Sequence, residues 1–173
     1  MPSYDSTSAE CLVFTFKEGL LSPVAHDLRL RVTRFSIEVD AASSAVVARF
    51  DTSSLVVDCP MKDGTENPSA LSASDKQKIS GQIRDDVLHA AKHPEAMFRS
   101  SAVTARGDGG YDLEGELTLH GVTRVLGACR TRVVAGRQQL ELRLHQPDFG
   151  ITPYRAMLGT LKIQAGVTIR VTV

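Results

Sequence analysis

The chain has 173 residues, and its 20 lysine and arginine residues balance 20 aspartate and glutamate residues. This length suits one well-buried domain, and the balanced charge removes the electrostatic argument for a nucleic-acid partner, because phosphate contacts need a surplus of basic side chains. Three widely spaced cysteines, Cys11, Cys59 and Cys129, are odd in number and form no C-x-x-C pair, so we expect free thiols and neither a disulfide framework nor a zinc site.

The start of the chain has neither the basic residues nor the apolar stretch of a signal peptide. No segment approaches the ~20 apolar residues that a membrane span needs. We therefore expect a cytoplasmic protein without a transmembrane segment. Residues 1–10 are expected to form a disordered tail, followed by a single domain over residues 11–173.

The first half of the chain predicts short strands, because apolar and polar side chains alternate with a period of two. Segment 11–16 has three large apolar side chains on one face, segment 46–51 alternates in the same way, and segment 55–58 continues as another short strand. Residues 59–73 contain Pro60, Gly64 and Pro68 among charged side chains, which is typical of a loop.

The segment 25–40 is unusually long for one strand, and its alternation changes phase. The apolar residues have even numbers as far as Val32 and odd numbers from Phe35 onward. A period of two can change parity only where an extra residue is inserted or the chain turns. The sequence therefore predicts a bulge or a sharp bend near Thr33–Arg34.

One helix is predicted between Asp75 and Lys92. Ser74 can cap its first amides, and apolar side chains recur at a spacing of three or four residues. Pro94 disfavours helical geometry at the residue before it and removes a backbone donor, so the helix should end there. We expect the helix to pack on the outside or the end of the sheet through Ile79, Ile83, Val87 and Leu88.

After the helix, alternation returns and predicts antiparallel hairpins. The expected strands cover 96–105, 111–120, 124–135, 139–145 and 161–172. Between the last two, segment 146–159 combines two prolines and two glycines with Phe149 and Tyr154. Such a composition indicates an ordered loop that packs aromatic side chains onto the rest of the protein.

About eight amphipathic strands and one inserted helix define an all-β protein that fits either a two-sheet sandwich or a closed antiparallel barrel. The length of the strands favours the barrel. An eight-stranded barrel has room for side chains or for one small ligand. The side chains expected inside this barrel are mostly aliphatic, so a hollow interior would suit a flexible aliphatic chain.

The parity of the strands predicts which side chains face the interior. With Phe149 and Tyr154 closing one end, the candidate ligand-binding residues are Leu12, Phe14, Phe16, Leu28, Leu30, Val32, Phe50, Leu113, Leu117, Leu142, Phe149, Tyr154, Ile163 and Val167.

Four motifs carry a family resemblance that covers nearly the whole chain. They are SPVAHDL from Ser22, VLHAAKHPEAMFRS from Val87, GELTLHGVTR from Gly115 and DFGI from Asp148. In this order they resemble the signatures of the YceI-like family, many members of which are periplasmic. The resemblance implies a lipocalin-like antiparallel barrel around a long amphiphilic ligand, such as a polyisoprenoid lipid or an isoprenoid quinone. It also implies a binding protein that is not an enzyme and has no cofactor beyond such a ligand.

The histidines could take part in catalysis or metal binding, but each has a simpler structural interpretation. His26 beside Asp27 could act as a general base, yet no nucleophile can be placed near it, and a structural hydrogen bond is favoured. His89 and His93 stand four apart on the predicted helix without a recognisable third ligand, so no metal is expected. His120 and His145 lie at predicted turns, where histidines are most often solvated or bonded to the turn.

The arginines of two strands also have two interpretations. Arg29, Arg31 and Arg34, and likewise Arg130 and Arg132, should mostly face solvent by parity. If one group lay at the mouth of the barrel, its guanidinium groups could bind a pyrophosphate or another polar head group.

Three functional classes remain from the sequence. The first is a carrier or sensor of an isoprenoid lipid, an isoprenoid quinone or a fatty acid derivative, and this is the function we expect. The second is a barrel enzyme acting on a lipid, which would need His26 or another titratable group to face the cavity. The third is a structural module with a filled barrel. The sequence leaves a homodimer open.

Overall fold

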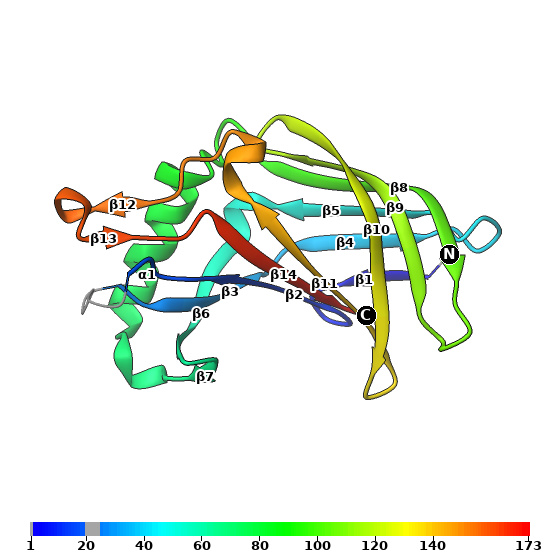
Figure 1. The fold of residues 1–173 in the computed structure, drawn as a ribbon, viewed down its shortest axis with the longest axis horizontal. Helices are drawn as coiled ribbons and strands as arrows, with labels where there is room; N and C mark the ends of the chain where they lie inside the picture. The colour runs from blue at the N-terminus through cyan, green and yellow to red at the C-terminus, as the bar shows by residue number, and fades with distance from the viewer. Residues whose placement is uncertain (1, 20–24) are drawn as a thin grey trace.

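The computed structural model describes residues 2–19 and 25–173, and most of them belong to one curled antiparallel sheet (Figure 1). The all-β class and the inserted helix are confirmed, although the strands are more numerous than the eight expected. The motif segment 22–24 lies outside the described residues.

Twelve strands form the main sheet, in the order β1-β4-β5-β8-β9-β10-β11-β14-β2-β3-β6-β7. Their bounds in chain order are β1 Ser3–Asp5, β2 Glu10–Thr15, β3 Asp27–Val32, β4 Phe35–Val39, β5 Val46–Asp51, β6 Leu55–Lys62, β7 Thr65–Glu66, β8 Glu95–Ala105, β9 Tyr111–Leu119, β10 Val122–Val134, β11 Arg137–His145 and β14 Gly166–Thr172.

The predicted bend at Thr33–Arg34 is confirmed, and it shapes the barrel. β3 ends at Val32 and pairs with β2 and β6, whereas β4 begins at Phe35 and pairs with β1 and β5. Thr33 N–H donates to the Ser54 carbonyl at 3.2 Å, and Asp51 N–H donates to the Arg34 carbonyl at 3.0 Å. These bonds hold the corner at which the chain passes from one side of the sheet to the other, and the change of phase keeps both halves apolar inside.

Two segments expected to be irregular are strands in part. β1, in the predicted disordered tail, pairs with β4 from Ser3 opposite Glu38 to Asp5 opposite Ser36. β6 continues into the first four residues of the predicted 59–73 loop, as far as Lys62, with Pro60 almost fully buried. Pro60 lies opposite Leu28, close to a register shift between β3 and β6. The prediction failed there because a proline in a strand is tolerated next to such an irregularity.

The helix is shorter than predicted and begins earlier. α1 spans Ala73–Gln82, and Ser72, not Ser74, caps it in a reciprocal capping box with Asp75. A π-helical turn, Ile83–Val87, follows. His89 then adopts a left-handed backbone with φ of 46°, so the helix ends five residues before the predicted Lys92. α1 lies across one end of the barrel (Figure 1).

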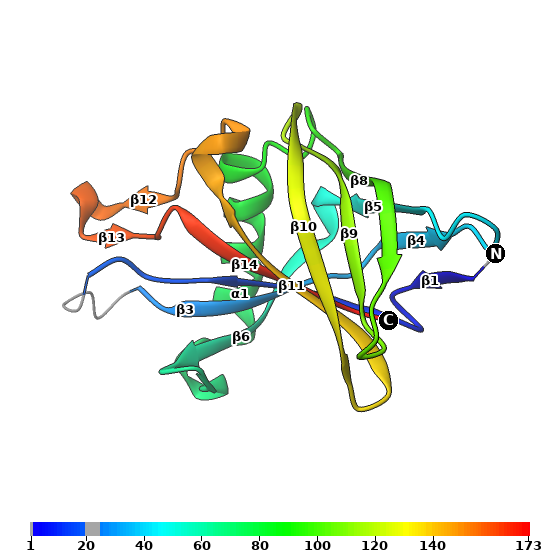
Figure 2. The ribbon, with the colours of Figure 1, turned by 45° about the vertical axis from the view of Figure 1, so that its right-hand side comes forward.

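The predicted last strand, 161–172, is divided in two. β12 (Arg155–Ala156) and β13 (Leu161–Lys162) pair only with each other, and β14 begins at Gly166. The small β12–β13 hairpin projects from the barrel at the end where α1 lies, as both ribbon views show (Figures 1 and 2). Among the described residues, no helix is both long and apolar enough to cross a membrane.

Candidate functional site

A cavity of about 1,000 Å³ occupies the interior of the barrel. This volume lies at the upper end of the range for small-molecule pockets, ~300–1,000 Å³. The lining includes both Gln138 and Gln146, at the two ends of β11. Eight residue steps of ~3.4 Å separate them, so the lining follows this strand for ~27 Å of its path. The interior is therefore long and hollow, and the alternative of a filled barrel is wrong.

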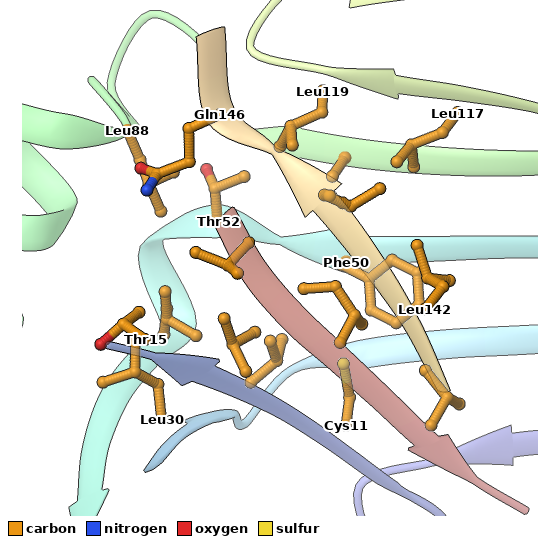
Figure 3. Close-up of a pocket in the computed structure, with 18 of the residues that line it drawn as sticks. Cys11, Thr15, Leu30, Phe50, Thr52, Leu88, Leu117, Leu119, Leu142 and Gln146 are labelled. Atoms are coloured by element: carbon orange, nitrogen blue, oxygen red, sulfur yellow. The ribbon is translucent and has the colours of Figure 1, made fainter. Parts of the chain in front are cut away.

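The walls of the cavity are apolar because each strand turns its apolar parity set inward. Leu117, Leu119 and Leu142 point into the space together with Phe50 in Figure 3. Leu142 is only half-buried although it points inward, because the space beside it is empty.

The structure brings together eleven of the fourteen predicted ligand-binding residues as lining of this cavity. They are Leu28, Leu30, Val32, Phe50, Leu113, Leu117, Leu142, Phe149, Tyr154, Ile163 and Val167. Phe149 is 3% exposed and is thus anchored from the 146–159 loop, which is ordered as expected. Whether these residues bind a ligand stays a prediction.

The other three, Leu12, Phe14 and Phe16, do not line the cavity, so the predicted parity of β2 was wrong. Leu12 lies opposite Arg31 and Arg170 on the neighbouring strands, and Phe14 places its ring 4.7 Å from the Arg170 guanidinium. Both faces of this strand are apolar, and the prediction chose the bulkier one. The long arginine stems cover that face from outside, which is a common use of amphipathic side chains.

The opposite face of β2 supplies lining that the sequence reasoning missed, namely Cys11, Val13 and Thr15 (Figure 3 labels the first and last). The helix was also assigned to packing alone. Its apolar stripe lines the cavity at Ile79, Ile83, Val87 and Leu88. The amphipathic pattern of the helix was the available signal for this contribution.

Several polar side chains that line the cavity are already hydrogen-bonded to the protein. Thr52 Oγ1 donates to the His93 carbonyl at 2.6 Å, and Gln146 Nε2 donates to the Gln164 carbonyl at 3.0 Å. Toward the other end, Thr131 Oγ1 donates to Gln138 Oε1 at 2.7 Å. No buried side-chain nitrogen or oxygen of the described residues lacks a partner. The walls thus offer little polar contact to a molecule inside.

Titratable groups reach the cavity mainly at its α1 end, where Asp75 and Lys78 are exposed, and at His26. Asp27 does not require a catalytic role, because its Oδ1 accepts a hydrogen bond from Lys17 N–H at 2.8 Å and so joins the ends of β2 and β3. Burial, together with the charge of Glu10, raises the pKa of the Cys11 thiol to about 12, so this wall residue stays uncharged.

Three histidines gather outside the cavity. His89 Nδ1 lies 3.1 Å from His120 Nε2, and the ring centroids of His93 and His120 are 4.3 Å apart. In residues 2–19 and 25–173, no group of three or more histidine, cysteine or acidic side chains is arranged to hold a metal ion. His145 Nδ1 lies 3.1 Å from Asp148 Oδ1 within its own turn, as expected for a turn-bonded histidine.

The arginines face outward, as parity predicted. Arg29 bonds to Asp58 and Glu66, while Arg31 contacts Glu10 and Asp58. The other three also have partners: Arg34 pairs with Asp51, itself a lining residue, while Arg130 meets Asp112 and Arg132 meets Gln139. None of these five arginines lines the cavity, so they form no head-group site at its mouth.

Curated proteins match short parts of the chain. A UPF0312 protein of Vibrio parahaemolyticus is 42% identical over 62 residues, which is 36% of this chain and 31% of that protein. A UPF0312 protein of Pseudomonas savastanoi pv. phaseolicola is 54% identical over 39 residues, or 22% of this chain and 20% of that protein. The chain thus spans less than a third of the length of these relatives.

Solved structures match nearly the whole fold at low sequence identity. Burkholderia cenocepacia BcnA has a TM-score of 0.66 at 17% identity and covers 97% of this chain and 96% of its own. A polyisoprenoid binding domain from Saccharophagus degradans, implicated in plant cell wall breakdown, has a TM-score of 0.65 at 15% identity, with 98% and 94% coverage. These likenesses show the fold.

The model of the YceI-like domain matches residues 6–173. This match includes the three motifs after residue 86 and extends over the barrel, the helix and the cavity described above. The chain belongs to the YceI-like family.

Proposed function

We propose that this protein binds a long amphiphilic lipid, such as a polyisoprenoid, an isoprenoid quinone or a fatty acid derivative, with its tail in the barrel cavity. The observation that carries the proposal is the long apolar cavity, in which Thr52, Gln146 and Thr131 are already hydrogen-bonded to the protein. A hydrocarbon tail fits such walls because it brings no polar group that would lose its hydrogen bonds to water. The polyisoprenoid binding domain of similar fold supports the same ligand class.

The head group should remain at the α1 end of the cavity, where the lining is polar and exposed. Lys78 and Gln82 lie on the cavity side of α1, and Lys78 is the only lysine or arginine among the described lining residues. A single exposed cation contributes little in water. Tail length should therefore determine affinity more than head-group charge does.

A series of prenyl alcohols from geraniol through farnesol to geranylgeraniol tests the proposal. Each buried methylene contributes ~0.8 kcal/mol before ordering costs, so affinity should rise by about tenfold or more with each isoprene unit. Isothermal titration calorimetry measures the series, and solvent extraction of the purified protein followed by mass spectrometry searches for a native lipid. Affinity that is undetectable, or independent of length, would contradict the proposal.

Binding without catalysis is part of the proposal. His26 lines the cavity, and in a lipid-acting enzyme it would be the natural general base. We expect His26→Ala to alter ligand retention or stability only. Incubation of the wild-type protein with prenyl diphosphates and fatty acyl esters, followed by product analysis, should show no turnover. A product that forms with the wild type and is lost in His26→Ala would establish an enzyme instead.

A further inference from the structure

The β12–β13 hairpin carries two large apolar side chains that the rest of the protein does not cover. Met157 is 61% exposed and Leu158 is 107% exposed, and they form the turn between the two strands. Both have a left-handed backbone, with φ of 53° and 54°. Glycine and asparagine are the usual residues at such angles, because other side chains are strained there. A bulky apolar pair at this turn is therefore unfavourable for the isolated fold.

The hairpin is nevertheless held in a defined position. Ile163 N–H donates to the Tyr154 carbonyl at 3.1 Å, and Glu18 N–H donates to the Lys162 carbonyl at 2.8 Å. Within the turn, Thr160 N–H donates to the Met157 carbonyl at 3.1 Å. These bonds join the base of the hairpin to the barrel while its tip projects outward (Figures 1 and 2).

The base of the hairpin is also part of the cavity wall. The lining includes Ala156, Met157, Leu161 and Ile163 of this segment. Apolar residues of the hairpin therefore line the cavity as far as Met157, which is next to the exposed Leu158. The hairpin marks a mouth of the cavity.

Basic side chains flank the tip. Arg155 and Lys162 pair across β12 and β13, and Lys17 forms a bridge to Ile163 next to them. The acidic residues nearest these cations are Glu18 and Asp27, which accepts a hydrogen bond from Lys17 N–H. An apolar tip with cations beside it matches the boundary between the acyl chains and the phosphates of a bilayer.

We propose that the β12–β13 hairpin inserts Leu158 and Met157 into the surface of a lipid bilayer and so places the mouth of the cavity against the membrane. This inference rests on the proposed lipid ligand, because a tail can then pass between bilayer and cavity without crossing water. Arg155 and Lys162 would lie at the level of the phosphates and favour anionic lipids.

A second copy of the chain is a poorer occupant for this tip. A stable dimer buries ~800 Å² of each partner, which two side chains on a projecting turn do not supply. A bilayer surface needs no complementary shape and accepts a narrow apolar tip. The geometry therefore favours the membrane over self-association.

Co-sedimentation with unilamellar vesicles tests the proposal, using phosphatidylcholine alone and phosphatidylcholine with added phosphatidylglycerol. Wild type should bind both and prefer the anionic vesicles, with the preference reduced at high salt. Asparagine tolerates the left-handed backbone of this turn, so Leu158→Asn should leave the turn intact. It should weaken vesicle binding by ~10-fold or more. The matched control is Val125→Thr on β10, because Val125 is 77% exposed and lies outside the hairpin. It should bind like wild type.

Three results would overturn the proposal. The first is a wild type that does not bind vesicles, the second is a Leu158→Asn variant that binds like wild type, and the third is equal loss in Val125→Thr. If size-exclusion chromatography shows a wild-type dimer that Leu158→Asn dissociates, the tip is a contact between copies instead.

Prenyl binding in detergent-free buffer separates this inference from the proposed function. Leu158 does not line the cavity, so Leu158→Asn should retain the affinity of wild type for farnesol. Vesicle binding without farnesol binding would leave the docking surface in place and overturn the lipid ligand. Farnesol binding without vesicle binding would support the lipid ligand and overturn the insertion of the hairpin into the bilayer.

Discussion

Cys11 illustrates how the cavity determines the chemistry of a single residue. It is 3% exposed and lines the wall, while the next side chain, Leu12, faces the outer side of the sheet. Burial disfavours the thiolate, and the nearby charge of Glu10 adds to this effect, so the pKa of Cys11 rises from 9.0 to about 12. The thiolate is the reactive form of cysteine.

We expect Cys11 to resist alkylation. In a variant with Cys59→Ser and Cys129→Ser, iodoacetamide at mildly alkaline pH should modify the native protein far more slowly than the urea-unfolded protein, because burial raises the pKa of Cys11 and so lowers its thiolate fraction. Intact mass spectrometry follows the reaction. Native labelling as fast as in urea would show that Cys11 is not held in the apolar wall.

His120 is the second residue whose surroundings alter its protonation. Partial burial, and then the proximity of His93, lower its pKa below the usual 6.5, so the native protein holds this proton less tightly than the unfolded chain does. Where the unfolded state binds more protons than the native state, stability decreases as the pH decreases. The loss should therefore begin as pH drops below 6.5 and should be absent well above it.

The variant His120→Asn should lose stability less steeply in that window. Asparagine tolerates the left-handed backbone of this position, where φ is 54°, so the turn itself should survive. Urea unfolding midpoints measured between about pH 7.5 and 5 provide the comparison with wild type. A decline as steep as in wild type would assign the acid sensitivity to other groups.

At the scale of elements, the packing of β9 between its neighbours β8 and β10 depends on one glycine. Gly115 lies opposite Ser100 on β8 and Leu126 on β10, and a register shift follows each of these partners. A Cβ at Gly115 would fall on the Arg99 carbonyl oxygen and lie 2.8 Å from Phe98 Cζ. The glycine allows β8 and β9 to approach closely while both ladders are interrupted.

Gly115→Ala should therefore destabilise the protein by ~1–3 kcal/mol, the usual cost of forcing atoms into a packed region. The control is Gly127→Ala in β10, where a Cβ would meet no atom within 4 Å. Urea unfolding measures both free energies. Equal effects of the two substitutions would exclude the close approach at Gly115 as the cause.

Elements were predictable from sequence where a pattern had one interpretation. The change of phase at Thr33–Arg34 could arise only from an interruption, and the bend is there. The end of the helix was not predictable, because tertiary structure sets the left-handed backbone of His89. A histidine does not by itself indicate such a backbone. The β12–β13 hairpin was hidden because each of its strands has only two residues.

The lining of the candidate site was likewise predictable only where the sequence pattern had one interpretation. Strands with one apolar face gave the correct lining, as at Leu28 and Leu30 of β3. β2 is apolar on both faces, so alternation could not choose between Val13 and Phe14, and the choice depended on which arginines cover the outer side. Sequence parity thus locates a wall only when the opposite face is polar.

At the scale of the whole molecule, the decisive property is that the inner side chains pack in two clusters and still leave a space inside the sheet. Parity predicts which residues face inward, but only the radius of the curled sheet decides whether they leave a space. Here the remaining volume is about 1,000 Å³. A protein that keeps such a space forgoes the packing contacts that a dense core would supply. That loss is understandable if a ligand tail supplies these contacts when bound.

Leu142→Trp tests this property without any knowledge of the ligand. Leu142 points into the space from β11 (Figure 3), so a larger side chain should enter the cavity and leave the free energy of unfolding within about 1 kcal/mol of wild type, whereas in a filled core it would cost ~1–3 kcal/mol. The same substitution should weaken geranylgeraniol binding by about tenfold or more, because the indole occupies the path of the tail. Phe14→Trp is the control, since Phe14 faces Arg170 on the outer side and should leave prenyl binding unchanged. Strong destabilisation by Leu142→Trp, or unchanged binding of geranylgeraniol, would show that the tail does not use this space.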